Sequence, residues 1–173
     1  IYTLSYLPYA AASGDTSLSN LIHEMWKNQQ YMLSYHSGVT DTHPYSSRWY
    51  QWLLDIRPIL YYMDNSVSGV TTRFAAFVNP VVCWGGLLAI LACGFHGIVR
   101  RSGKALFIFI GYLAQLVPWL FIGRITFAYH YFPSTVFLVL ALCMAFSDWI
   151  DCGSARGKKW MALFTGVCLG LFV

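Results

Sequence analysis

The sequence has few charged residues. Of its 173 residues, 10% are Asp, Glu, Lys or Arg, whereas 57% are hydrophobic and 18% are aromatic. Soluble domains carry about 25% charged residues and rarely expose large apolar patches. This composition, with a mean hydropathy of +0.52, excludes a soluble globular enzyme and a nucleic-acid-binding domain. It indicates an integral membrane protein.

The sequence also lacks the short motifs of several common chemistries. It contains no G-x-G-x-x-G segment, no Walker phosphate loop and no Ser-His-Asp pattern. None of the five cysteines forms a C-x-x-C pair, so neither a disulfide nor a zinc site is implied. The spacing of His23, His36 and His43 matches no metal motif. We therefore expect no metal and no cofactor.

Hydropathy divides the chain into three parts. Residues 1–12 are apolar but too short to cross a bilayer, which needs about 20 residues. They lack the flanks of a signal peptide, and we interpret them as the end of a truncated transmembrane helix. Residues 13–78 are polar and aromatic, and residues 79–173 form a predicted transmembrane bundle. Its complete spans are predicted at about 79–99, 105–122 and 127–147, with a truncated span from 160. The predicted fold is an all-α, polytopic transmembrane helical bundle.

Basic residues predict how the bundle is oriented. Six of the eleven Lys and Arg residues lie in two loops on one side: Arg100, Arg101, Lys104, Arg156, Lys158 and Lys159. Lys and Arg are enriched in cytoplasmic loops. Residues 13–78 carry four Lys/Arg and five Asp/Glu, so they do not resemble such a loop. We predict that this segment is extracytoplasmic.

An amphipathic helix is predicted within this segment, from Leu18 to about Ser34. Its apolar residues recur at helical spacing, and Ser17 or Ser19 can cap its N-terminus. A face with Trp and Met suits the membrane interface, and it suits packing on other external loops equally well. The stretch from Arg48 to Tyr62 is rich in Trp and Tyr, which is typical of an aromatic belt at headgroup level.

The first group of candidate binding residues lies in residues 124–134. Arg124 occupies a short external turn, and His130 begins the third predicted span. A guanidinium, an imidazole and the positive end of a helix together suit an anionic group such as a lipid-linked phosphate. The alternative is that Arg124 snorkels to ordinary headgroups while His130 bonds a neighbouring helix. Pro133 is expected to kink the span.

The second group lies in residues 43–58. Arg48 and Arg57 are secondary candidates for a phosphate or acceptor site, together with His43. Asp55 is expected to pair with either arginine. An interfacial aromatic anchor containing a local Arg–Asp pair accounts for the same residues, so both interpretations remain open.

The order of several short motifs resembles that of a known family. The motifs are Tyr6-x-Pro8, Gln30-x-Met32, Tyr35-His36, His43-Pro44-Tyr45-Ser46-Ser47-x-Trp49-x-x-Trp52, Arg57-Pro58, Asn79-Pro80 and His130-Tyr131-Phe132-Pro133. In this order they closely resemble the C-terminal four-helix membrane region of the protein O-mannosyltransferases, in the glycosyltransferase-C superfamily. Leu53 departs from the pattern, because many members have proline there.

The resemblance implies an enzyme that moves mannose from a polyprenyl-phosphate donor to Ser or Thr of an acceptor protein. Transfer would occur on the extracytoplasmic face with inversion at the sugar, in a bacterial plasma membrane or, in a eukaryote, the endoplasmic reticulum membrane. The family's catalytic carboxylates lie in an external loop that this chain lacks. No residue here is therefore predicted to be catalytic, and the fragment is predicted to be inactive alone. The expected partners are the lipid donor, the acceptor protein and membrane lipids, without nucleic acid.

Two other functions remain open from the sequence. One is a different glycosyltransferase-C member, such as an enzyme that transfers aminoarabinose to lipid A. The other is a non-enzymatic membrane component or transporter module. The complete predicted spans have no charged residue in the middle, where ion pathways usually need one.

Overall fold

The computed structural model describes residues 1–65, 69–153 and 155–171, and the chain divides into two compact units. The N-terminal unit contains residues 1–41, and the bundle unit contains residues 42–173. The predicted external segment, residues 13–78, is thus shared between both units.

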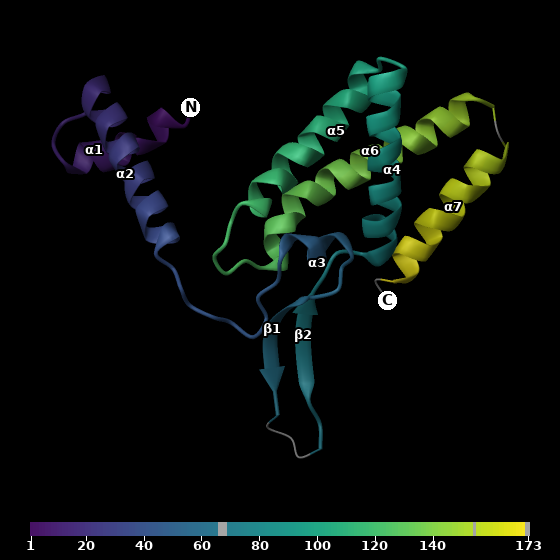
Figure 1. Ribbon diagram of the computed structural model, residues 1–173, viewed down its shortest axis with the longest axis horizontal. Helices are drawn as coiled ribbons and strands as arrows, with labels where there is room; N and C mark the ends of the chain where they lie inside the picture. Colours follow the sequence, from purple (N-terminus) through teal and green to yellow (C-terminus); the bar gives the residue numbers. More distant parts are fainter. Residues whose placement is uncertain (66–68, 154, 172–173) are drawn as a thin grey trace. The chain divides into compact units, whose positions relative to one another are not determined.

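The N-terminal unit is helical. A 3-10 helix, η1 (Thr3–Tyr6), runs into α1 (Leu7–Ala12), and both pack against α2 (Leu18–Ser37; Figure 1). The hydroxyl oxygen of Ser17 accepts a hydrogen bond from the Asn20 N–H at 3.2 Å, which satisfies one free donor of the first turn. The predicted helix is confirmed, and it ends three residues later than expected.

In the described part of the chain, the bundle unit has a short helix, α3 (Trp49–Leu53), followed by four longer helices. They are α4 (Pro80–Val99), α5 (Gly103–Leu116), α6 (Phe132–Asp151) and α7 (Ala155–Gly170). Two 3-10 segments flank the α5–α6 turn, η2 (Val117–Leu120) and η3 (Ala128–Tyr131). Figure 1 shows α4, α5 and α6 packed together with α7 beside them.

Three helical segments of the described chain are long and apolar enough to cross a membrane. They are Pro80–Val99, Gly103–Leu120 and Ala128–Asp151, close to the three complete spans expected from the sequence. The protein is thus a helical membrane protein, as predicted. The fourth helix, α7, has 16 residues and begins five residues before the predicted start of the truncated span.

Glycine allows the closest approach between α4 and α6. A Cβ atom added at Gly86 would lie 2.6 Å from the Leu138 Cβ and 3.2 Å from its Cα. Small residues commonly permit such backbone approach between membrane helices.

Pro133 does not kink a span, and that expectation was wrong. The residue lies in the first turn of α6, where the backbone N–H has no partner within the helix. Proline fits such a position without breaking a hydrogen bond. Pro133 therefore begins α6 rather than bending it.

In sequence, a β-hairpin follows the amphipathic helix and precedes the membrane spans, and the sequence analysis did not predict it. Strand β1 (Ile59–Asp64) pairs antiparallel with β2 (Thr72–Ala76), with an irregularity in register between Leu60 and Tyr62. In Figure 1 it extends from the end of the bundle at which α3 (Trp49–Leu53) lies. The hairpin adds a small extramembrane element to an otherwise helical fold.

Hydrogen bonds hold α3 against the N-terminal end of α4. The Cys83 thiol donates to the Leu53 carbonyl at 3.5 Å, and the Trp84 indole N–H donates to the Leu54 carbonyl at 3.3 Å. Asn79 caps α4 through the Val81 and Val82 N–H groups, and its amide also donates to the Cys168 carbonyl of α7 at 3.0 Å. The loop before α4 and the last turns of α7 therefore share one end of the bundle.

Candidate functional site

The two groups of candidate residues meet at this end of the bundle. The Ser47 N–H donates to the Thr126 carbonyl at 2.8 Å, and the Thr126 hydroxyl donates to the Ser47 carbonyl at 2.6 Å. Both residues are buried, with 3% and 4% of their surface exposed. Buried reciprocal hydrogen bonds of this kind fix two segments that lie 79 residues apart in sequence.

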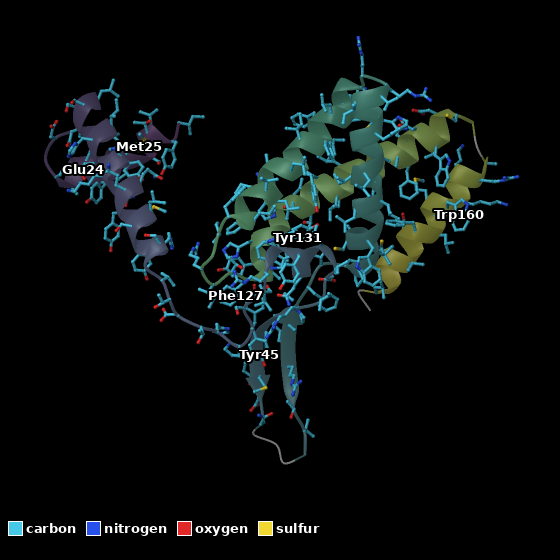
Figure 2. All side chains as sticks on the ribbon, in the orientation of Figure 1. Glu24, Met25, Tyr45, Phe127, Tyr131 and Trp160 are labelled. Carbon is cyan, nitrogen blue, oxygen red and sulfur yellow. The ribbon has the colours of Figure 1, made fainter. Side chains whose placement is uncertain are left out.

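Further contacts extend this connection on either side. The His43 ring packs edge-on against Phe127 with centroids 5.3 Å apart, and the Arg48 Nη1 donates to the Gly123 carbonyl at 3.4 Å. Figure 2 shows Tyr45, Phe127 and Tyr131 in this region. We call the region the basic junction. It is defined by the five predicted binding residues: His43, Arg48, Arg57, Arg124 and His130.

His130 is held in an aromatic box. Its ring centroid lies 4.3 Å from that of Trp119 and 4.2 Å from that of Tyr129, and it stacks on Trp52 at 6.1 Å. These three rings fix the plane of the imidazole and leave its edge to form hydrogen bonds.

The backbone of Phe127 engages one nitrogen of the His130 ring. Nδ1 lies 3.1 Å from the Phe127 nitrogen and 2.9 Å from its carbonyl oxygen. When Nδ1 accepts from the N–H, the neutral ring carries its proton on Nε2, and a protonated ring donates at both nitrogens. Nε2 makes no hydrogen bond in the described part of the chain. In these two forms Nε2 can donate to an anionic ligand, whereas a neutral ring protonated on Nδ1 donates to the Phe127 carbonyl and leaves Nε2 as an acceptor.

Arg124 is the arginine of the junction whose guanidinium makes no hydrogen bond to the described residues. It is half-buried and lies six residues before His130 in the sequence. Arg48 is instead bonded to the Gly123 carbonyl, and Arg57 donates to the Pro44 carbonyl. Arg124 thus has its donors free, whereas Arg48 and Arg57 each donate a hydrogen bond to the backbone of the junction.

The expected pairing of Asp55 with an arginine was wrong. Neither Arg48 nor Arg57 forms an ion pair with it among the described residues. The carboxylate accepts a hydrogen bond from the Val78 N–H, and burial raises the pKa of Asp55 above its ordinary value. Because this carboxylate is engaged elsewhere, it does not neutralise the positive charge that the junction offers to an anion.

Trp52 supports the junction by contacting both Ser47 and His130. The sequence analysis did not assign it this role. Its indole N–H donates to the Ser47 hydroxyl at 2.8 Å, and 3% of the residue is exposed. It also packs against Tyr131, whose hydroxyl lies 2.8 Å from that of Tyr112 in the core. The five-residue spacing of Ser47 and Trp52 is visible in the sequence, but nothing local indicates that Thr126 completes the contact.

Chemically, the junction can bind an anion at the end of the bundle. It offers a free guanidinium and an imidazole whose Nε2 is unbonded, and aromatic packing and backbone hydrogen bonds orient the imidazole. Charge-assisted hydrogen bonds from such groups are the strong contacts of phosphate sites. Among the described residues, no three His, Cys, Asp or Glu side chains are grouped to hold a metal ion.

Several known proteins are similar to this chain. Over 163 residues, which cover 87% of it, the chain is 23% identical to the polyprenol-phosphate-mannose–protein mannosyltransferase of Mycobacterium tuberculosis. Over 178 aligned residues, covering 86% of the chain, it is 25% identical to the corresponding protein of Mycolicibacterium smegmatis. It spans 31% and 34% of the lengths of these relatives.

A solved structure shares the fold. The chain aligns with the S. cerevisiae protein O-mannosyltransferase Pmt1–Pmt2 complex bound to the sugar donor, with a TM-score of 0.53 and 19% identity. The alignment covers 90% of this chain and 22% of the yeast chain. The family described as the C-terminal four-transmembrane region of protein O-mannosyltransferase matches residues 21–173. The chain belongs to this family.

Proposed function

We propose that this chain is the donor-handling membrane region of a protein O-mannosyltransferase. The proposed reaction moves mannose from a polyprenyl-phosphate carrier to Ser or Thr hydroxyls of an acceptor protein. The bacterial relatives are named polyprenol-phosphate-mannose–protein mannosyltransferases, which supports this donor class and a protein acceptor. The observation that carries the assignment is that Arg124 and His130 flank one short turn at one end of the bundle, with no hydrogen bond to the Arg124 guanidinium or to the His130 Nε2 from the described residues.

The proposed role of the junction follows from where charge develops in the reaction. When the acceptor oxygen attacks the sugar, the bond between the anomeric carbon and the phosphate oxygen breaks, and that oxygen leaves with the bonding electrons. Donors that are already oriented stabilise this charge without rearranging. Arg124 and His130 would hold the phosphate, while His43, Arg48 and Arg57 would shape its surroundings.

The chain does not supply the catalytic base in this proposal. A base must reach the acceptor hydroxyl and be ionised near the working pH. The carboxyl of Asp55 is bonded to the Val78 N–H and is partly buried, so we do not assign it this role. We propose that the base belongs to the rest of the enzyme and that residues 1–173 are inactive alone.

The proposed orientation places the junction on the extracytoplasmic side. Arg100 and Arg101 lie between α4 and α5, and Lys104 lies in the first turn of α5, all at the bundle end opposite Asn79, where basic residues favour the cytoplasm. Independently of the bundle, α2 exposes apolar residues that suit a membrane interface, with Leu18, Trp26 and Leu33 at 65%, 60% and 74% exposure.

Donor kinetics of the complete enzyme test the phosphate site. We expect Arg124→Ala to lower kcat/KM for polyprenyl-phosphate-mannose by about 10- to 100-fold, because a hydrogen bond to a charged group contributes about 1.5–3 kcal/mol. Arg100→Ala is the matched control, since it removes the same charge at the other end of the bundle. Equal donor kinetics for both variants and the wild type would refute the assignment.

A further inference from the structure

The N-terminal unit contains a cavity that the proposed phosphate site does not use. Its volume is about 310 Å³, and it is open on one side. Its lining comes from η1, α1 and α2, which pack together (Figure 1). The lining residues are Tyr2, Ser5, Tyr6, Tyr9 and Asn28. Four hydroxyl groups and one carboxamide therefore surround the space, and none of these side chains carries a formal charge.

Hydrogen bonds orient the polar groups of this cavity. The Asn28 amide donates to the Tyr6 hydroxyl at 2.9 Å, and the Gln29 amide donates to the Tyr2 hydroxyl. The two tyrosine hydroxyls also bond each other at 3.2 Å. These contacts join η1 to α2, so the cluster belongs to the packing of the unit rather than to separate mobile side chains.

The cluster still has donors and acceptors for a ligand. Because the Asn28 amide N–H bonds the Tyr6 oxygen and its carbonyl oxygen bonds none of the described residues, that oxygen can accept a hydrogen bond from a ligand. Of the two paired tyrosine hydroxyls, one donates to the other, which leaves the second hydrogen free. The Tyr9 hydroxyl bonds none of the described residues. A ligand that both donates and accepts hydrogen bonds at several positions would satisfy this set.

The aromatic rings add apolar faces to the polar groups. Tyr2 and Tyr6 pack edge-on with centroids 5.6 Å apart, and Tyr9 is 61% exposed. The C–H bonds of a pyranose ring pack well on such faces, while its hydroxyl groups bond the surrounding donors and acceptors. A volume of about 310 Å³ lies at the low end of small-molecule pockets, which suits a single sugar ring.

We propose that this cavity binds one neutral hexose unit. The choice of mannose as that hexose rests on the proposed function. Its lining has no cation to hold a phosphate, so the cavity is a sugar site distinct from the basic junction. The mannosyl unit can come from the lipid donor or from an acceptor protein that already carries mannose.

Binding of methyl α-mannoside to the purified full-length protein in nanodiscs tests the site. We expect saturation-transfer NMR to detect the sugar and to place its ring protons against tyrosine. Tyr6→Phe removes the hydroxyl that Asn28 bonds, and we expect a 2- to 10-fold weaker affinity, about the effect of losing neutral hydrogen bonds. Tyr31→Phe is the control, because Tyr31 is 67% exposed on the same helix as Asn28 and lies outside the cavity.

A second variant and a second readout keep the test decisive. Asn28→Ala leaves α2 intact, since Asn28 is exposed in a helical position, and it should weaken binding similarly. Arg124→Ala should leave methyl α-mannoside binding unchanged. The absence of binding to wild-type protein, or equal affinities for the wild type, Tyr6→Phe and Asn28→Ala, would refute the sugar site. The donor kinetics of Arg124→Ala would still report separately on the proposed function.

Competition identifies the source of the sugar. The measurement is the displacement of methyl α-mannoside by polyprenyl-phosphate-mannose and by a mannosylated Ser/Thr peptide, with polyprenyl phosphate and the unmodified peptide as controls. Displacement by the mannosylated lipid alone assigns the cavity to the donor. Displacement by the mannosylated peptide alone assigns it to a previously modified acceptor. Equal displacement by each compound and its sugar-free control would overturn recognition of the mannosyl group.

Discussion

Trp52 is the residue through which the loop of residues 43–58 supports the basic junction. Its indole N–H bonds Ser47, and its ring stacks on His130. We expect Trp52→Phe to lower the free energy of unfolding by about 1–3 kcal/mol, because the buried Ser47 hydroxyl loses its donor. Chemical denaturation in detergent micelles measures this change.

A double-mutant cycle separates the hydrogen bond from the loss of ring volume. Ser47→Ala alone should also destabilise the protein, because it leaves the Trp52 N–H buried without an acceptor. The double variant Ser47→Ala/Trp52→Phe should cost less than the sum of the single changes. Strict additivity would show that the 2.8 Å contact contributes nothing specific.

Asp55 gives the protein a pH dependence of known sign. Burial raises the pKa of the Asp55 carboxyl in the folded state. The carboxyl therefore contributes its full stability to the folded state below its pKa in the unfolded chain, about 4. That contribution is lost as the pH rises through the folded pKa. Asn tolerates the left-handed backbone at this position, where φ is 52°, and its side-chain oxygen can still accept from Val78.

We therefore expect Asp55→Asn to raise Tm at about pH 7 relative to the wild type and to lose that advantage near about pH 4. Thermal unfolding of both proteins across this pH range measures the difference. An advantage that grows as the pH falls would contradict the buried carboxylate. Asp15→Asn is a control at an exposed carboxyl, and a different pH profile is expected because hydrogen bonds from Ser17 lower the pKa of Asp15.

Arg124 and His130 are six residues apart across one short turn, so the sequence alone assigns them to one region. The approach of the segment that contains His43 and Arg48 to this turn, through Phe127 and Gly123, could not be predicted. It depends on the hydrogen bonds between Ser47 and Thr126, two short polar residues whose patterns carry no information about each other. The partner of Asp55 could not be predicted either. Its negative charge favoured an arginine, whereas in the structure the carboxyl interacts with the Val78 N–H.

At the scale of helices and strands, the close contact between α4 and α6 is the feature most sensitive to substitution. Gly86→Ala would place a methyl group 2.6 Å from the Leu138 Cβ. We expect a loss of about 1–3 kcal/mol in unfolding free energy from overpacking, reduced in part by the better helix propensity of Ala. Denaturation in detergent measures the net effect.

Gly166→Ala is the matched control within α7. A Cβ atom there would meet nothing within 4 Å, so the helix propensity of Ala should stabilise the protein by about 0.5–1 kcal/mol. Opposite signs for the two substitutions are the expected outcome. A stabilising effect of Gly86→Ala would show that α4 and α6 are further apart than the structure has them.

The long helices could be predicted from the periodicity and length of their apolar segments, but the short elements could not. The helix from Leu18 and the three spans have continuous patterns over about 20 residues, which identify a helix with little ambiguity. The hairpin occupies a stretch whose Tyr and Met residues suit an aromatic belt as well as a strand. Tyr61 and Phe74 contact each other across the two strands with centroids 6.2 Å apart, a pairing that only the register reveals.

At the scale of the whole bundle, the polar and basic residues lie in two separate groups, one at each end. The basic junction, the hairpin and the Asn79 link to α7 lie at one end. The loops that contain Arg100, Arg101 and Cys152 lie where α4 and α6 finish, at the other end. Since membrane potential and loop charge bias such an asymmetric molecule towards one orientation, the side of the junction can be measured with two thiols.

Cys152 is exposed at the end of α6, whereas Cys83 and Cys93 are buried. A Cβ atom added at Gly123 meets nothing within 4 Å, so Gly123→Cys introduces a thiol beside Arg124 without a clash. A membrane-impermeant maleimide should label this introduced thiol only in right-side-out vesicles and Cys152 only in inverted vesicles. The reverse pattern would place the junction on the cytoplasmic side and refute the proposed orientation. Labelling of both thiols from one side would contradict the alternating path of α4, α5 and α6 itself.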